Sequence, residues 1–99
     1  MPVTATLRVV PSPVGSVEPR PEQIREAVRR LGMLGFRVVN AGHYSVIVQS
    51  DARRFEDVLG VRAPGRNKGL ATDFRPRDSS LVGIVDRVEI APPAQFLDM

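Results

Sequence analysis

Hydrophobic and polar residues alternate near the start of the chain. Ala5, Leu7 and Val9 fall on one side of an extended segment and Thr4, Thr6 and Arg8 on the other. This is the pattern of a half-buried strand, so we predict a strand from Thr4 to Val10. Prolines at positions 11, 13, 19 and 21 and a glycine at 15 then predict a stiffened loop, because proline lacks the amide hydrogen that helices and sheets use.

The period changes from two to about 3.6 after Pro21. Ile24, Ala27, Val28 and Leu31 are spaced as one face of a helix, and proline suits the first helical turn. Gly32 or Gly35 is expected to end this helix.

Two strands and a second helix are predicted next. Residues 36–39 and 44–49 are rich in β-branched residues, and the segment 40–43 between them has the Asn and Gly of a hairpin turn. Ser50 or Asp51 is a suitable cap for a short helix that Gly60 ends. The apolar stripe of that helix consists of Ala52, Phe55, Val58 and Leu59.

The remaining pattern predicts a loop, a last strand and a tail. Prolines and glycines interrupt residues 62–80, although 69–74 could pair briefly at a sheet edge. We predict a strand from Leu81 to Ile90, with a bulge or a sheet end near Asp86, because that charged residue occupies an inward position. Pro92 and Pro93 end the strand and leave an extended tail at 91–99.

The predicted order is β-α-β-β-α-β over a single domain, residues 1–99. This order is typical of an α+β, ferredoxin-like split βαβ sandwich, with a four-stranded antiparallel sheet and two helices on one face.

Composition excludes several kinds of site. The chain is 42% hydrophobic and 25% charged, which is ordinary for a folded domain. It has no cysteine and one histidine, so we expect no disulfide, no metal site and no cofactor. The amino terminus lacks the features of a secretory signal, and no apolar run is long enough to cross a membrane. A cytoplasmic protein is the expectation; an excised propeptide of a secreted precursor is the alternative.

All of the net charge of +3 comes from residues 62 to 80, which include five basic and two acidic residues. The basic residues are candidates for binding anionic groups, over roughly 8–10 Å: Arg62, Arg66, Lys68, Arg75 and Arg77. Binding of nucleic acid through this segment is one interpretation. It lacks support from aromatic residues, because the predicted sheet offers Tyr44 at most for stacking bases.

No catalytic arrangement is apparent. His43 lies in the predicted hairpin, and Ser45 is too close in sequence to be poised as its nucleophile. Glycines 60, 65 and 69 do not have the spacing of a phosphate-binding loop. We therefore expect that the chain is not an enzyme and that it acts by binding.

The tail is the most informative segment for a binding function. Phe96, Leu97 and Met99 are apolar and follow two prolines that direct them away from the sheet. Such residues predict docking into a groove of another protein. The alternative is that the tail folds back over the open face of its own sheet.

Three stretches resemble the propeptide-like inhibitor domains of subtilisin-type and sedolisin-type serine peptidases. They are Leu31 to Val48, which includes Gly35-Phe36-Arg37-Val38; Phe55-Glu56-Asp57-Val58-Leu59-Gly60-Val61; and Val85-Asp86-Arg87-Val88-Glu89-Ile90. The segment from Arg62 to Ser80 and the missing signal peptide depart from a secreted prodomain.

The resemblance implies a peptidase inhibitor or folding chaperone. The open sheet face would pack on two helices of a subtilisin-like peptidase, and Glu89 would cap helix ends there. The tail residues Phe96, Leu97, Asp98 and Met99 would enter the substrate cleft, with Met99 in the primary specificity pocket. The alternative from a different class is a small oligomeric or regulatory subunit whose sheet pairs with another copy.

Overall fold

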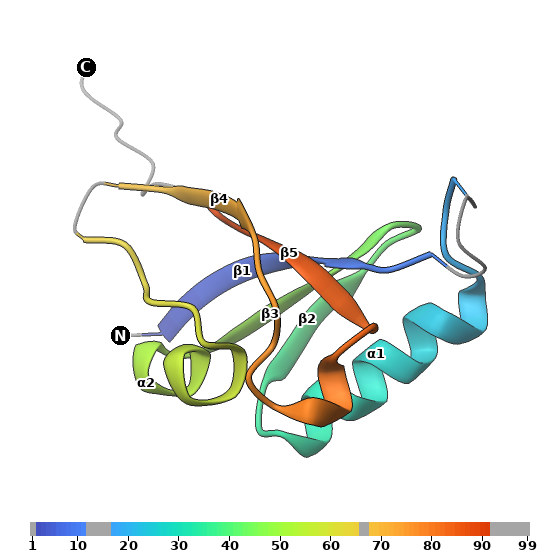
Figure 1. Cartoon of the computed structure of the whole chain (residues 1–99), viewed down its shortest axis with the longest axis horizontal. Helices are drawn as coiled ribbons and strands as arrows, with labels where there is room; N and C mark the ends of the chain where they lie inside the picture. The colour runs from blue at the N-terminus through green and yellow to red at the C-terminus, as the bar shows by residue number, and fades with distance from the viewer. Residues whose placement is uncertain (1, 12–16, 66–67, 92–99) are drawn as a thin grey trace.

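Five strands form one antiparallel sheet in a computed structural model that describes residues 2–11, 17–65 and 68–91. The sheet order is β2-β3-β1-β5-β4 (Figure 1). The strands are β1 (Pro2–Val9), β2 (Arg37–Ala41), β3 (Ser45–Asp51), β4 (Leu70–Asp73) and β5 (Val85–Ile90).

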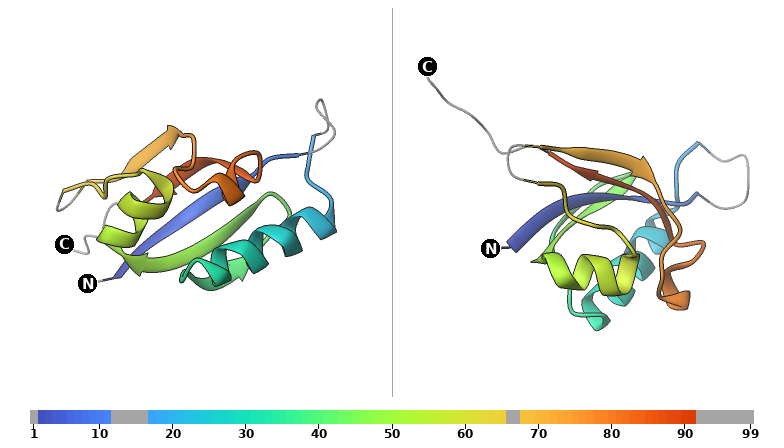
Figure 2. Two further views of the ribbon diagram at one scale, coloured as in Figure 1. Left: turned by 60° about the horizontal axis from the view of Figure 1, so that its bottom comes forward. Right: turned by 60° about the vertical axis from the view of Figure 1, so that its left-hand side comes forward.

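Two helical segments cover one face of this sheet and leave the other face open (Figure 2). They are α1 (Pro21–Met33) and α2 (Ala52–Arg54), which continues directly into the π-helical segment η1 (Phe55–Leu59). A short 3-10 helix, η2 (Ser79–Leu81), lies on the same side. None of the helices in the described part of the chain has the length and apolar content needed to cross a bilayer.

The predicted α+β class with an antiparallel sheet and two helices is confirmed, but the prediction of four strands is wrong. The fifth strand, β4, lies inside the predicted loop at 62–80 and pairs with β5 through Leu70↔Ile90 and Thr72↔Val88. The expectation of brief edge pairing at 69–74 is therefore confirmed. Leu70 packs against the core from this edge, which explains why a segment flanked by glycine and proline still joins the sheet.

The last strand begins four residues later than the sequence predicts. Asp78 accepts hydrogen bonds from the backbone and the hydroxyl of Ser80, which close a 3-10 turn through Leu81. Gly83 then adopts φ +79°, a conformation that few other residues tolerate. The predicted bulge is confirmed, because the β1–β5 register shifts between Arg8↔Arg87 and Val9↔Val85 and leaves Asp86 as the extra residue.

One hydrophobic core lies between the sheet and the helices. Strand β1 contributes three side chains that are at most 1% exposed, and Phe36 and Phe55 meet edge to face with ring centres 5.2 Å apart. The buried core residues are Ala5, Leu7, Val9, Ile24, Ala27, Leu31, Phe36, Val46, Val48, Phe55, Leu59, Val61, Leu81, Val85, Val88 and Ile90.

The ends of the helices follow the sequence signals. Asp51 caps α2 by accepting a hydrogen bond from the backbone of Arg54 at 2.8 Å. Gly60 ends η1 with φ +72°, as predicted. Helix α1 ends at Met33, and Gly35 at φ +93° turns the chain toward β2, where the Arg54 guanidinium donates to the carbonyl of Leu34 at 2.9 Å.

Candidate functional site

The open face of the sheet is the candidate site, and its central residues come from β1, β3 and β5. Because side chains alternate along a strand, Thr4, Thr6 and Arg8 face away from the helices. The register places Gln49, Ile47 and Ser45 of β3 beside them on one side, and Glu89 and Arg87 of β5 beside Thr6 and Arg8 on the other. The open face therefore combines threonine hydroxyls with the apolar Ile47 and the charged Glu89 at its centre, and further charged side chains lie toward the Arg8 end.

The charged end is a network of ion pairs within β5 and between β5 and its two neighbouring strands. The Arg8 guanidinium donates to both oxygens of Asp86, at 2.8 and 2.6 Å. These hydrogen bonds, and then the charge of Asp86, raise the pKa of Arg8. Arg87 donates to Asp73 at 3.0 Å, and its Nε lies 3.7 Å from Glu89. A hollow of about 300 Å³ opens among these side chains, lined by Thr6, Arg8, Ser45, Arg87 and Glu89.

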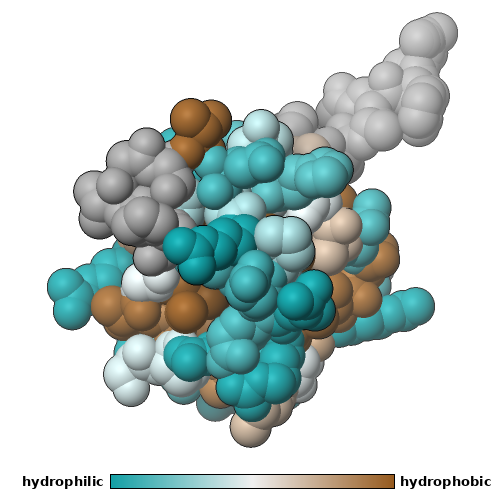
Figure 3. All heavy atoms as spheres, turned by 90° about the vertical axis from the view of Figure 1, so that its right-hand side faces the viewer, coloured by the Kyte–Doolittle hydropathy of each residue, from teal (hydrophilic) through white to brown (hydrophobic). Residues whose placement is uncertain are grey.

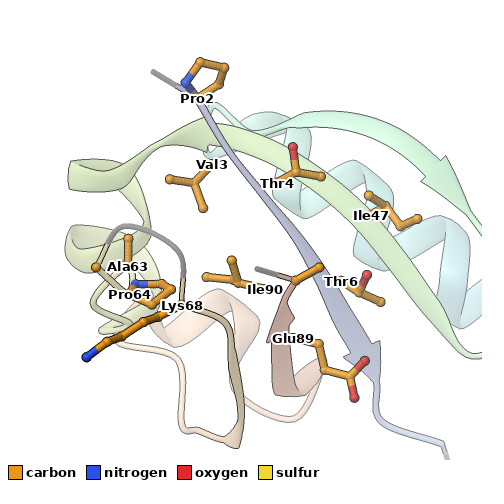
Figure 4. A pocket seen from close by; sticks show the side chains of 12 residues that line it. Pro2, Val3, Thr4, Thr6, Ile47, Ala63, Pro64, Lys68, Glu89 and Ile90 are labelled. Carbon is orange, nitrogen blue, oxygen red and sulfur yellow. The ribbon is translucent and has the colours of Figure 1, made fainter. Parts of the chain in front are cut away.

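The opposite end has a larger and mostly apolar hollow of about 440 Å³. Figure 4 shows the start of β1 on one side of it and the segment carrying Ala63, Pro64 and Lys68 on the other. Val3 and Ile90 lie between these two walls, and Lys68 supplies a cation at the rim. Its lining consists of Pro2, Val3, Thr4, Thr6, Ile47, Ala63, Pro64, Gly65, Lys68, Glu89, Ile90 and Ala91.

Glu89 stands between the two hollows. It lines both of them, as does its cross-strand neighbour Thr6. The Glu89 side chain is 57% exposed, and Arg87 is its one ion-pair partner within the described ranges. The residue that the sequence nominated for contact with a partner is thus accessible at the middle of the open face.

The basic residues of segment 62–80 lie in separate surroundings. Arg62 reaches toward Glu56, with 3.9 Å between Nε and the carboxylate, whereas Lys68 lines the large apolar hollow. Arg77 lies near Gly60, and Arg75 is exposed after β4. Arg66 is outside the described residues. The four described cations therefore do not line a common hollow.

The remaining candidate residues from the sequence are those of the tail and His43. The tail residues Phe96, Leu97, Asp98 and Met99 lie outside the described residues. His43 is exposed in the β2–β3 turn. Among the described residues, no three His, Cys, Asp or Glu side chains lie together as metal ligands would.

Figure 3 shows the end of the molecule that carries the β2–β3 turn and the start of α1. No continuous apolar surface crosses the visible part of this end. Hydrophilic side chains occupy the middle of this view, and hydrophobic ones lie to either side (Figure 3). Tyr44 and Val82 are large exposed hydrophobic residues of the chain, with 52% and 40% exposed. The hollows of the open face are the better candidates for a binding site.

Arg8, Ser45 and Asp86 are parts of the site that sequence reasoning did not nominate. The alternation in β1 already placed Arg8 on the polar face, and the misplaced charge of Asp86 already indicated a bulge. Their pairing depends on the register between β1 and β5, two strands separated by most of the chain. No local pattern of residues specifies that register.

Comparison with known proteins adds no relationship. The chain matches no protein-family model, and no curated protein or solved structure is significantly similar to it.

Proposed function

We propose that this chain is a non-catalytic protein-binding domain that acts as a propeptide-like inhibitor or folding chaperone of a subtilisin-like serine peptidase. The observation that supports this function is the open sheet face. The helices cover one side, and the other side has two hollows separated by Thr6 and Glu89. In this proposal two neighbouring helices of the partner, each about 10–12 Å wide with its side chains, lie on either side of the ridge formed by Thr6 and Glu89.

A relationship to ferredoxin-like split βαβ folds is part of the proposal. Without β4, the remaining strands have the order β2-β3-β1-β5, and the two helical segments follow β1 and β3 in the chain. Strand β4 adds to the edge of the sheet beside β5 and brings Asp73 to the open face. The addition widens that face without covering it.

The tail and the open face would engage the same partner. Strand β5 carries Glu89 on the open face and ends at Ile90, and the tail follows directly in the sequence. An extended tail can add to a partner as a strand through main-chain hydrogen bonds. In this proposal Met99 fills the primary specificity pocket of the peptidase, Phe96 fills the apolar pocket three residues earlier, and Glu89 caps helix ends beneath the sheet face.

Inhibition of a subtilisin-like peptidase by three forms of the chain tests the function. The intact chain should inhibit, and a chain ending at Ala91 should bind roughly a hundredfold or more weakly, because burying each large apolar side chain is worth about 1.5–3 kcal/mol. Glu89→Gln should weaken inhibition to a smaller extent. The matched control is Glu56→Gln on the helix layer, which should inhibit like the intact chain.

Two outcomes contradict the proposal at different points. If the intact chain does not inhibit at micromolar concentration, the peptidase function is wrong. If the chain ending at Ala91 inhibits as well as the intact chain, the tail has no part in the mechanism.

Assembly of copies through sheet edges has less support. Strand β2 has a register shift at Val39 on one edge, and β4 on the other edge has only four residues. Short and irregular edge strands disfavour pairing with another sheet. Light scattering of the purified chain tests this alternative, since a stable dimer would double the mass.

A further inference from the structure

The smaller hollow of the open face is rich in unused hydrogen-bond donors. Arg8 uses Nε and Nη2 on Asp86, which leaves its Nη1 group, and Arg87 uses Nη1 on Asp73, which leaves Nη2. The hydroxyls of Thr6 and Ser45 line the same hollow. Neither hydroxyl makes a hydrogen bond to another side chain or backbone group within residues 2–11, 17–65 and 68–91.

The two arginines are held close together although their charges repel. Arg8 and Arg87 lie directly opposite each other in the β1–β5 ladder, a placement that destabilises an antiparallel pair when the charges are alike. Asp86 and Asp73 hold the two guanidinium groups through hydrogen bonds of 2.6–3.0 Å. These ion pairs orient the two guanidinium groups and leave Nη1 of Arg8 and Nη2 of Arg87 as single donor groups, one from each strand, and charge-assisted donors of this kind suit a carboxylate.

We propose that the hollow of Thr6, Arg8, Ser45 and Arg87 binds a carboxylate carried by an Asp or Glu side chain of the docking protein. The proposal rests on the protein-binding function above and specifies the chemistry of the partner at this point. The ionised groups around the hollow are Arg8 and Arg87 against Asp73, Asp86 and Glu89, so the local net charge is −1. The net charge therefore does not attract a free anion from a distance. A carboxylate is held by short, directed hydrogen bonds from the arginines and hydroxyls, together with the other contacts of the docked surface.

Titration of the ¹⁵N-labelled intact chain with acetyl-Ala-Glu-Ala-amide tests the site without any peptidase. We expect saturable NMR shifts at the backbone amides of Thr6 and Ser45 and at the Nε–Hε groups of Arg8 and Arg87. Binding should be weak, in roughly the millimolar range. The neutral peptide acetyl-Ala-Gln-Ala-amide should bind about tenfold more weakly, because a hydrogen bond to a charged group contributes about 1.5–3 kcal/mol. Inorganic phosphate should also bind more weakly than the Glu peptide, because its larger negative charge is repelled more strongly by the net negative cluster.

Two variants distinguish peptide binding in the hollow from nonspecific binding to exposed arginines. Arg87→Gln should weaken binding of the Glu peptide about tenfold, whereas Arg62→Gln, which removes an exposed arginine with a loose ion pair to Glu56, should leave it unchanged. Equal shifts with the Glu and Gln peptides, shifts spread over all surface arginines, or phosphate binding as tight as the Glu peptide would each overturn the proposal.

Peptide binding and peptidase inhibition test the carboxylate site and the proposed function separately. Inhibition of the peptidase without peptide binding would remove the carboxylate site and leave the proposed function standing. Peptide binding without inhibition would retain the site and remove the peptidase as the partner.

Discussion

The two faces of the sheet differ sharply although the same strands build both. Leu7 and Thr6 are neighbours in β1, yet Leu7 is fully buried beneath the helices and Thr6 lies between two hollows on the other side. The covered face consists of aliphatic side chains packed in one core. The open face is held by ion pairs that solvent reaches, such as Arg8–Asp86, with 50% and 36% of the side chains exposed.

The difference indicates that the covered face stabilises the fold, whereas the open face is free to serve the binding function that we propose. Burial of aliphatic side chains is the main contribution to stability in a domain of this size. Exposed ion pairs contribute about 0–1 kcal/mol each. Residues of the open face can therefore be substituted to test binding while the chain stays folded.

The largest expected effect comes from comparing Leu7→Ala with Thr6→Ala. Leu7→Ala should lower the free energy of unfolding by about 2–5 kcal/mol, because it leaves a cavity in the core. Thr6→Ala should change it by no more than about 0.5 kcal/mol. Urea denaturation followed by circular dichroism measures both. Similar losses in the two variants would mean that the open face contributes to stability as the core does.

A smaller effect is expected at the turn that brings β2 beneath α1. Gly35 has φ +93°, and a Cβ there would overlap the guanidinium of Arg54, so Gly35→Ala should destabilise by about 1–2 kcal/mol. Gly32→Ala is the matched control in the last turn of α1, where a Cβ meets nothing within 4 Å. It should stabilise the helix by about 0.5–1 kcal/mol. Thermal unfolding should give a lower Tm for Gly35→Ala and a higher Tm for Gly32→Ala than for the intact chain. This result would confirm that the backbone conformation at each glycine decides the effect of the added methyl group.

The elements of the covered face were predictable because their signals are local. The alternation in β1, the helical period after Pro21 and the stop at Gly60 each lie within a few residues of the element they specify. Asp86 is the most informative local signal, because a charge at an inward position indicated a bulge that the register confirms.

The candidate site could be predicted only in part, because it depends on contacts between distant segments. Strand β4 is stabilised by pairing with β5 and by the packing of Leu70 against the core. The prolines and glycines around β4 predict a loop, so the local sequence does not predict these contacts. The juxtaposition of Arg8 with Arg87 depends likewise on a non-local register. Glu89 was nominated from a resemblance, and its position between the hollows follows from the same pairing.

The smallest expected effect concerns Glu26, a half-buried carboxylate of the helix layer, and its dependence on pH. Hydrogen bonds from Arg29, then from Arg30, lower the pKa of Glu26 from 4.5 to about 2. Arg30 also donates to the carbonyl of Ser80 at 2.6 Å, which ties α1 to η2. Because the pKa is depressed in the folded chain, the contribution of Glu26 is present above about pH 4.5 and is lost as the pH falls toward 2.

Comparing Glu26→Gln with the intact chain at two pH values isolates this contribution. At pH 7 the variant should have a slightly lower urea midpoint. Near pH 2 most of this gap should close, because Glu26 is then protonated in the unfolded chain and about half protonated in the folded chain. Glu22→Gln on the same helix is the control, since Glu22 has no ion pair among the described residues. A gap between Glu26→Gln and the intact chain that persists unchanged at pH 2 would show that the side chain acts through packing, and the charge of the helix layer would then have no part in holding α1 to η2.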